Sequence, residues 1–283
     1  MTVAPARDLL PGITLHAPDA REQQGSPRPW LHPITSPAGV VATDDQPDDH
    51  PWHRGLSLAV ANVALDDGSG LAAPPHNFWG GPTFVEGDYV QLANNGSQKL
   101  IERRLDHGSA RETLAWRTVE GRTIVHESRR ITAAVVSPTA TRLQWQSSLT
   151  GTTSAAVRFG SPTTAGRPQA GYGGLFVRGA RALLGAEVLL DGAPVDPSAA
   201  MGARADWAAL RSPGLTIALA SDPANPVSPA PWFVRVDPVV MLCAAPFFHA
   251  EWRLEPGETV TWRWTVLVVD GAPSASQLGD LLA

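Results

Sequence analysis

The stretch ETVTWRWTVLVVDG, residues 258–271, decides the fold class. Apolar side chains recur at every second position and begin with Val260, Trp262 and Trp264, whereas Arg263 and the threonines take the intervening positions. A strand places alternate side chains on opposite faces, but a helix needs an apolar period of 3.6 residues. The segment is therefore predicted to be a β-strand with one buried face.

The same period of two recurs in TRLQWQSSLTG, residues 141–151, and in GLSLAVANVAL, residues 55–65. Turn residues separate such segments, and hairpins are predicted to close near Gly121 and at the Asp-Gly pair of residues 191–192. No long, well-capped amphipathic helix is evident, although one or two helical turns are expected after Ser274. Antiparallel strands without crossover helices predict an all-β fold, a single large antiparallel β-sandwich domain over residues 1–283.

Composition excludes several kinds of protein. Of the 283 residues, 43% are hydrophobic and 17% are charged, which is typical of a globular chain with a sizeable core. The formal charge is −5, with 22 basic and 27 acidic residues, so no basic surface for nucleic acid is expected. No apolar run approaches the ~18 residues that a membrane helix needs, and no secretory signal is visible. A cytoplasmic protein with no membrane partner is expected, and its single Cys243 lies in an apolar stretch typical of a buried thiol.

Acids and histidines are dense in DDQPDDHPWHRG, residues 44–55. His50 and His53 are separated by Pro51, which excludes a continuous helix, and an extended strand would point the two rings to opposite faces. Only a turn brings them together. With His76 they offer three imidazoles for a metal ion, but neither an HExxH motif nor a cysteine pair accompanies them. The aspartates fit turn formation, so no metal or other cofactor is predicted.

A second group lies in PHNFWGG, residues 75–81, with Glu86 shortly afterwards. Trp79, and Trp52 from the first group, offer flat surfaces with a polar edge, against which a sugar ring lies well. Asn77 and the histidines are suited to bond its hydroxyl groups. Sequence therefore predicts a small sugar or oligosaccharide as ligand, and Arg54 and Arg178 are candidates to hold an anionic group on it.

Five motifs occur in an order that resembles a bacterial family labelled "methane oxygenase PmoA", or PmoA-like. They are HPITSPAGVVATDDQPDDHPWHRGL, HNFWGGPTF, GYGGLFVRGA, SDPANPVSPAPWFVR and LEPGETVTWRWTVLVVDG, and the resemblance covers about residues 28–272. Such a family is bacterial and largely uncharacterised, so the resemblance implies membership and no particular reaction.

The sequence Pro256-Gly257-Glu258 before the last strand is also similar to the end of aldose 1-epimerases of the galactose mutarotase type. This resemblance implies the galactose mutarotase-like supersandwich, with a histidine as acid and a glutamate as base. In the corresponding stretch this chain has Asp222 and Asn225 and no glutamate, so the base is not identified.

These observations predict a carbohydrate-active protein, an enzyme of epimerase, lyase or hydrolase type that uses histidine acid/base chemistry. The alternatives are a non-catalytic sugar-binding protein and a metal-dependent, oxygenase-like enzyme with His50, His53 and His76 as ligands. The oligomeric state is not predicted. Candidate catalytic residues are His50, His53 and His76, and candidate substrate-binding residues are Trp52, Arg54, Asn77, Trp79, Glu86 and Arg178.

Overall fold

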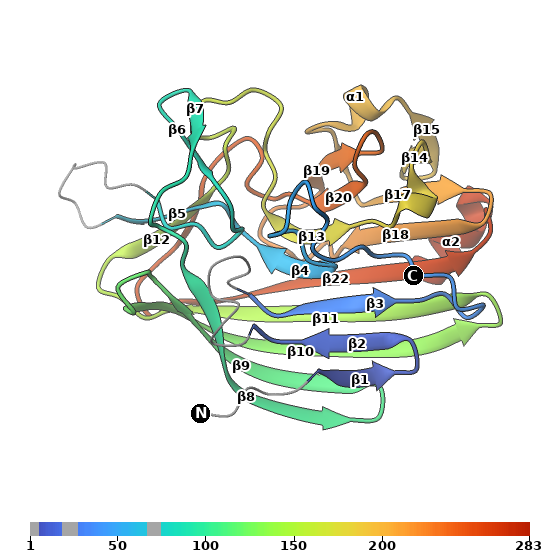
Figure 1. The fold of residues 1–283 in the computed structure, drawn as a ribbon, viewed down its shortest axis with the longest axis horizontal. Helices are drawn as coiled ribbons and strands as arrows, with labels where there is room; N and C mark the ends of the chain where they lie inside the picture. Colours follow the sequence, from blue (N-terminus) through green and yellow to red (C-terminus); the bar gives the residue numbers. More distant parts are fainter. Residues whose placement is uncertain (1–5, 19–27, 67–74) are drawn as a thin grey trace.

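The computed structural model describes residues 6–18, 28–66 and 75–283, and two large sheets dominate it (Figure 1). Every strand pairing within these sheets is antiparallel. One sheet runs in the order β1 (Arg7–Leu10), β2 (Ile13–His16), β3 (Trp30–Ile34), β4 (Leu56–Ala59), β13 (Gly174–Arg178), β20 (Met241–Ala244), β19 (Ala230–Arg235) and β16 (Arg204–Ala205). The other runs in the order β15 (Ala193–Val195), β14 (Glu187–Leu190), β17 (Trp207–Ser212), β18 (Leu215–Ser221), β22 (Thr259–Asp270), β11 (Ala140–Gly151), β10 (Thr123–Ser137), β9 (Ser109–Arg117) and β8 (Ser97–Asp106).

Smaller elements surround the two sheets. A three-stranded sheet contains β21 (Trp252–Leu254), β12 (Ala156–Gly160) and β5 (Asn62–Asp66), and a hairpin contains β6 (Thr83–Val85) and β7 (Asp88–Val90). The helical segments are η2 (Arg181–Leu183), α1 (Pro197–Ala200) and α2 (Ala275–Leu282). None of the helices in the described part of the chain is long and apolar enough to cross a membrane.

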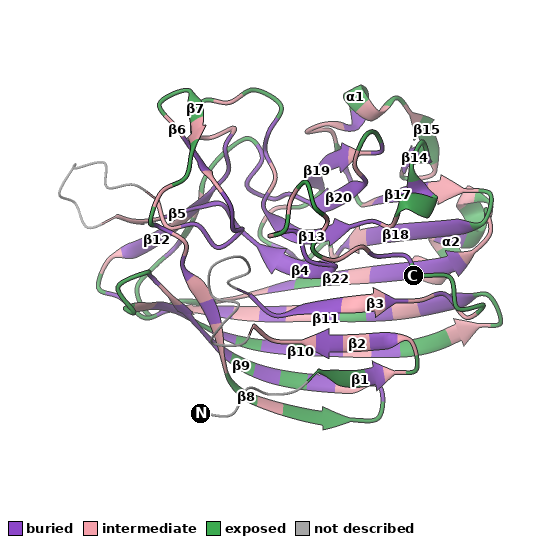
Figure 2. Ribbon diagram, in the orientation of Figure 1, coloured by how far each residue is buried: buried purple, intermediate pink, exposed green. Residues whose placement is uncertain are grey.

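The two large sheets pack their apolar faces together. One core cluster contains Leu31 and Leu56 from the first sheet and Trp116 and Trp145 from the second, all of them buried. Figure 2 shows this buried layer along the facing strands. Side chains from two facing antiparallel sheets form the core of a β-sandwich. The predicted all-β, antiparallel sandwich architecture is therefore confirmed.

Strand β22 lies inside the nine-stranded sheet, between β18 and β11. Trp262 and Trp264 are buried on its inner face and Arg263 is exposed, as the alternation predicts. Further along, both faces are buried because α2 covers the outer side, where its Leu278 packs against Leu267. Helix α2 begins after Ser274, whose side chain accepts a hydrogen bond from the backbone of residue 277, so the predicted short C-terminal helix is confirmed.

The predicted hairpins are also present. Asp191 and Gly192 connect β14 to β15 with φ angles of 48° and 86°, the left-handed values that a tight Asp-Gly hairpin turn requires. Gly121 lies in the turn between β9 and β10. Cys243 is fully buried in β20, and burial raises the pKa of its thiol to about 12, so the expectation of a buried, unreactive thiol is confirmed.

A group of charged side chains is buried between the sheets, on the inner face of β8, β9 and β10. Arg129 lies at its centre and makes a two-pronged contact with Glu127, at 2.7 Å from Nε to Oε1 and 3.0 Å from Nη2 to Oε2. Glu112 lies 3.4 Å from Arg129 and 2.6 Å from Arg103. Two guanidinium groups and two carboxylates therefore balance one another inside the core, while the neighbouring His126 is exposed.

Candidate functional site

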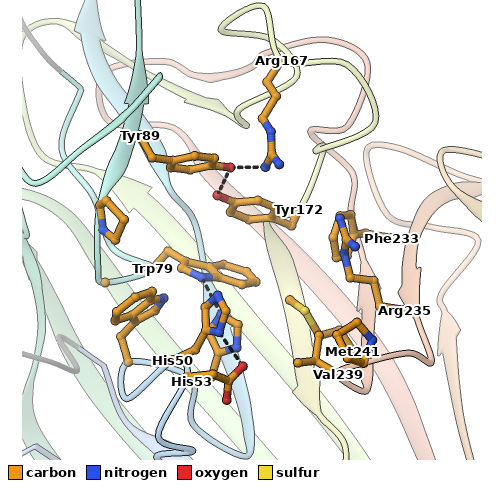
Figure 3. A pocket seen from close by; sticks show the side chains of 15 residues that line it. His50, His53, Trp79, Tyr89, Arg167, Tyr172, Phe233, Arg235, Val239 and Met241 are labelled. Atoms are coloured by element: carbon orange, nitrogen blue, oxygen red, sulfur yellow. Dashed lines mark hydrogen bonds and ion pairs between the residues drawn. The ribbon is translucent and has the colours of Figure 1, made fainter. Parts of the chain in front are cut away.

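A pocket of about 540 Å³ opens against strands β19 and β20 of the eight-stranded sheet. Its walls come from the loop of residues 44–55, the turn of residues 77–82, the β6–β7 hairpin, the loop of residues 161–173, and strands β19 and β20 (Figures 1 and 3). The lining residues are Asp49, His50, Trp52, His53, Trp79, Gly80, Pro82, Tyr89, Arg167, Tyr172, Phe233, Arg235, Pro238, Val239 and Met241.

The loop of residues 44–55 folds into consecutive turns that bring two histidines together. The backbone N–H of His53 donates to the carbonyl of His50 at 2.8 Å, and that of His50 donates to the carbonyl of Pro47 at 3.0 Å. The two imidazole rings stack with centroids 4.6 Å apart. The prediction that a turn makes these histidines converge is confirmed.

Asp49 joins His50 to a buried arginine. Its carboxylate lies 2.6 Å from His50 Nδ1 through one oxygen and 3.2 Å from Arg178 Nη2 through the other. Burial raises the pKa of Asp49, but the hydrogen bond from His50 and the charge of Arg178 together lower it below its usual value. The interpretation of all the loop aspartates as turn formers is therefore wrong for Asp49, which holds Nδ1 of His50 and leaves its Nε2 for a ligand.

His53 has a different environment from His50. Its Nδ1 lies 3.2 Å from Arg178 Nη1, and Trp79 Nε1 points to its Nε2 at 3.4 Å. Both neighbours are N–H donors, so a doubly protonated ring would face two donors without any acceptor. Burial, with the nearby charges of His50, Arg178 and Arg28, lowers the pKa of His53 to about 2. His53 is therefore neutral at ordinary pH and holds Arg178 and Trp79 in place.

The low pKa of His53 predicts a loss of stability in acid. A histidine has an ordinary pKa of 6.5, against about 2 for His53 in the fold, so between these values the unfolded chain binds the proton more tightly. The free energy of unfolding is then expected to fall as the pH decreases below about 6.5. Urea unfolding at about pH 7 and about pH 5 should show a smaller decrease for His53→Gln than for the wild type. The exposed His126→Gln is the control, and equal decreases in both variants would contradict the assignment.

The turn that carries Trp79 is held by Asn77. The side-chain oxygen of Asn77 accepts from the backbone N–H groups of Trp79 at 2.8 Å and Gly80 at 2.9 Å, and its amide nitrogen donates to Thr83 Oγ1 at 3.0 Å. Asn77 is fully buried and lies outside the pocket lining. All these contacts shape the turn, and the structure does not place the Asn77 amide at the pocket wall, where it was predicted to bond a sugar.

Gly81 follows in the same turn with a φ of 66°. A Cβ atom at this position would lie 2.4 Å from the indole of Trp52. A side chain there would displace the indole, so the glycine allows Trp52 to pack against the backbone at the pocket rim.

Arg28 is a buried residue that no sequence motif predicted. Its guanidinium donates to the backbone carbonyl groups of Trp79 and Trp52, the latter at 3.2 Å, and to Ser57 Oγ at 2.9 Å. Burial lowers its pKa to about 9, so Arg28 stays cationic near neutral pH. Arg28 therefore links the backbone of Trp52 to that of Trp79, the two tryptophans that line the pocket.

The opposite wall contains two tyrosines and an arginine that were not predicted (Figure 3). The hydroxyl oxygens of Tyr89 and Tyr172 lie 2.8 Å apart, and Arg167 donates to the oxygen of Tyr89 while its guanidinium covers that ring at 4.7 Å. Burial, followed by the influence of Tyr89, raises the pKa of Tyr172 well above its usual value. Tyr172 lies among glycines in the motif GYGGLFVRGA, and this position was the one feature of the sequence that could have indicated a place in the pocket.

Several predicted site residues lie elsewhere. The backbone of His76 pairs with Val63 of β5, and burial, the largest effect on its ring, lowers its pKa. Glu86 is exposed at the turn of the β6–β7 hairpin. Arg54 is buried, lies 3.2 Å from Asp45 and covers the ring of Trp30. His76, Arg54 and Glu86 therefore do not line the pocket that contains His50 and His53.

The predicted metal ligands do not form a metal-binding group. His50 and His53 line the pocket and His76 does not. Across residues 6–18, 28–66 and 75–283, no group of three or more His, Cys, Asp or Glu side chains is arranged to hold a metal ion. The hypothesis of an oxygenase-like site with these three ligands therefore lacks its geometric basis. Arg178 lies behind the pocket, between Asp49 and His53.

A family of unknown function, DUF6807, matches residues 10–283. The chain belongs to this family. The family description names no reaction, so membership of a group labelled as methane oxygenases stays a prediction. No curated protein sequence matches this DUF6807 member.

Solved structures resemble this DUF6807 chain only distantly. A heparan sulfate lyase mutant from Pedobacter heparinus aligns with 93% of the chain and 34% of its own length, at 9% identity and a TM-score of 0.42. A heparinase III aligns with 95% of the chain and 36% of its own length, at 10% identity and a TM-score of 0.33. A galactose mutarotase related enzyme from Lactobacillus acidophilus aligns with 68% of the chain and 78% of its own length, at 11% identity and a TM-score of 0.30. The chain thus spans about a third of the length of the heparan sulfate lyase and of the heparinase III.

Proposed function

We propose that this chain is a carbohydrate-active enzyme whose pocket binds a sugar and whose His50, oriented by Asp49, transfers a proton to or from it. The observation that supports this most is the 2.6 Å contact between Asp49 and His50 Nδ1 at the wall of an aromatic pocket. A carboxylate on one ring nitrogen sets the tautomer and leaves the other nitrogen for general acid/base work.

The pocket walls suit a sugar ring. Trp52, Trp79, Tyr89 and Tyr172 supply flat apolar surfaces with polar edges, and the volume of about 540 Å³ lies within the ~300–1,000 Å³ usual for small-molecule sites. Aromatic faces pack against the C–H groups of a sugar, and the tyrosine hydroxyls are placed to bond its oxygens. Epimerase and lyase chemistry both need such a held sugar beside a proton carrier.

A non-catalytic sugar-binding protein is the second candidate. Asp49 is the one carboxylate among the described residues that line the pocket, and both His50 and Arg178 hold it. Most glycoside hydrolases use two carboxylates across the sugar, so this arrangement disfavours hydrolysis of that kind. A cytoplasmic location and a single domain over residues 1–283 stay predictions.

Trp52→Ala is expected to weaken sugar binding about tenfold, since loss of a stacked aromatic face costs roughly 1 kcal/mol or more. Titration calorimetry with a panel of neutral and acidic mono- and oligosaccharides would measure the affinity. Trp207→Ala, a partly buried tryptophan packed near α2 and outside the pocket, is the matched control. Binding of no sugar in the panel, or equal loss in both variants, would contradict the proposed site.

A further inference from the structure

The pocket is cationic although the chain as a whole is acidic. Its charged lining residues are Asp49, Arg167 and Arg235, beside the titratable His50. Asp49 already has a cationic partner behind the wall, at 3.2 Å from Arg178. Neither Arg167 nor Arg235 forms an ion pair with any carboxylate in the described ranges of the chain. Arg167 contacts the hydroxyl oxygen and the ring of Tyr89, and Arg235 contacts the ring of Phe233. Two positive charges in the lining are therefore not neutralised by the protein.

Both arginines are half-buried and lie on different walls. Arg167 comes from the loop of residues 161–173, where its backbone N–H donates to the carbonyl of Pro162 at 2.8 Å. Arg235 ends strand β19, and its guanidinium lies 5.6 Å from the ring of Phe233. Tyr172 feels the positive charge of both, and Figure 3 shows it between them. The two guanidinium groups therefore flank one region of the pocket.

We propose that the ligand is an acidic sugar of the uronic acid class, whose carboxylate lies between Arg167 and Arg235 beside the hydroxyl of Tyr172. This inference rests on the sugar-binding function proposed above. A guanidinium presents a planar set of N–H donors that matches a carboxylate, and partly buried cations bind an anion more strongly than exposed ones do. The uncharged indole rings of Trp52 and Trp79 are then free to pack against the ring of the sugar.

The position of the carboxylate follows from a second hollow. Arg235 also lines a neighbouring hollow of about 440 Å³, together with Gln169, Ser198 and Asp237. Asp237 would repel an anion on that side. The carboxylate is therefore assigned to the Tyr172 side of Arg235, and a longer ligand would place an uncharged sugar unit in the second hollow.

The test compares matched sugars by titration calorimetry with the full chain: oligosaccharides of galacturonate, of galactose, and of sulfated galactose. We expect the galacturonate oligosaccharide to bind at least about tenfold tighter than the neutral one, with a preference that decreases as salt increases. Arg235→Gln should remove about tenfold of the affinity for the uronate and should weaken binding of the neutral sugar much less, because it removes the charge that pairs with the carboxylate. Arg235→Lys keeps the positive charge and should therefore lose less affinity for the uronate than Arg235→Gln does.

Arg104→Gln, an exposed arginine on β8 with a carboxylate partner, is the matched control and should change neither affinity. Equal binding of galacturonate and galactose would overturn the uronate inference and leave the sugar-binding proposal standing. Tighter binding of the sulfated sugar would overturn the carboxylate assignment. Failure of all three sugars, and of the wider panel, would remove the proposed function itself. A melting curve for each variant confirms that it is folded.

Discussion

His50→Gln is expected to reduce turnover about 10²–10⁴-fold, the usual contribution of a positioned general acid or base. Glutamine keeps a polar side chain of similar length but does not exchange a proton near neutral pH. Affinity for the sugar should change much less, since the aromatic walls of Trp52 and Trp79 are untouched. The measurement is kcat and binding affinity, determined separately on a sugar that the wild type converts.

Two further variants sharpen this result. Asp49→Asn should also reduce kcat, because an amide does not stabilise the positive charge that His50 gains as it takes a proton. His126→Gln replaces an exposed histidine on β10 and should leave both quantities unchanged. A protein that binds the sugar but shows no turnover with any variant or the wild type is a binding protein, and an active His50→Gln would remove His50 from the chemistry.

Arg129→Met is expected to lower the free energy of unfolding by about 3–5 kcal/mol, the usual cost of removing one partner from a buried charge pair. The substitution leaves the carboxylates of Glu127 and Glu112 in the core without their shared cation. The ring of Trp145, 4.6 Å from the guanidinium, also loses its cation contact. Urea unfolding of wild type and variant measures the difference.

Arg104→Met is the matched control for this experiment. It removes an arginine from a pair with Glu102 at 2.7 Å on β8, the edge strand of the same sheet, where the two side chains are 79% and 53% exposed. An exposed pair contributes about 0–1 kcal/mol, so its loss should barely move the unfolding curve. Similar decreases for Arg129→Met and Arg104→Met would mean that the buried network does not stabilise the core. Arg129→Lys should lower the free energy of unfolding by an amount between those of Arg104→Met and Arg129→Met. It keeps the positive charge, but one ammonium cannot replace the two-pronged contact with Glu127.

Four of the nine predicted site residues lie together in the structure. His50, His53, Trp52 and Trp79 line one pocket, because a turn in the loop of residues 44–55 was the geometry that Pro51 left open. Asn77 is next to this group and yet contributes no pocket atom. In an irregular segment, an amide that shapes a turn and an amide that bonds a ligand have the same neighbours in sequence, and only the hydrogen-bond partners distinguish them.

His76 shows a second limit on predicting site residues from sequence. It stands three residues before Trp79, but its backbone pairs with Val63, which draws its ring away from the pocket. Conversely, Arg167 and Tyr172 were not proposed, because they come from a loop about 80 residues beyond Tyr89 and meet it only in the folded chain. Contacts between distant segments leave no periodic signal in one sequence.

Sequence by itself determined the strands, their buried faces and the hairpins, because alternation and Asp-Gly turns act over a few neighbouring residues. It also showed that His50 and His53 could meet only if residues 44–55 form a turn. Only the tertiary structure decided that Glu127 and Arg129 lie on the inner face of β10. It also decided that the Asp49 side chain forms a hydrogen bond with His50 instead of shaping a turn. In the loop DDQPDDHPWHRG, Asp49 contacts Arg178 of β13 at 3.2 Å, although the two residues are far apart in sequence. Burial and charge pairing depend on what packs from elsewhere in the chain, and that is a property of the whole fold.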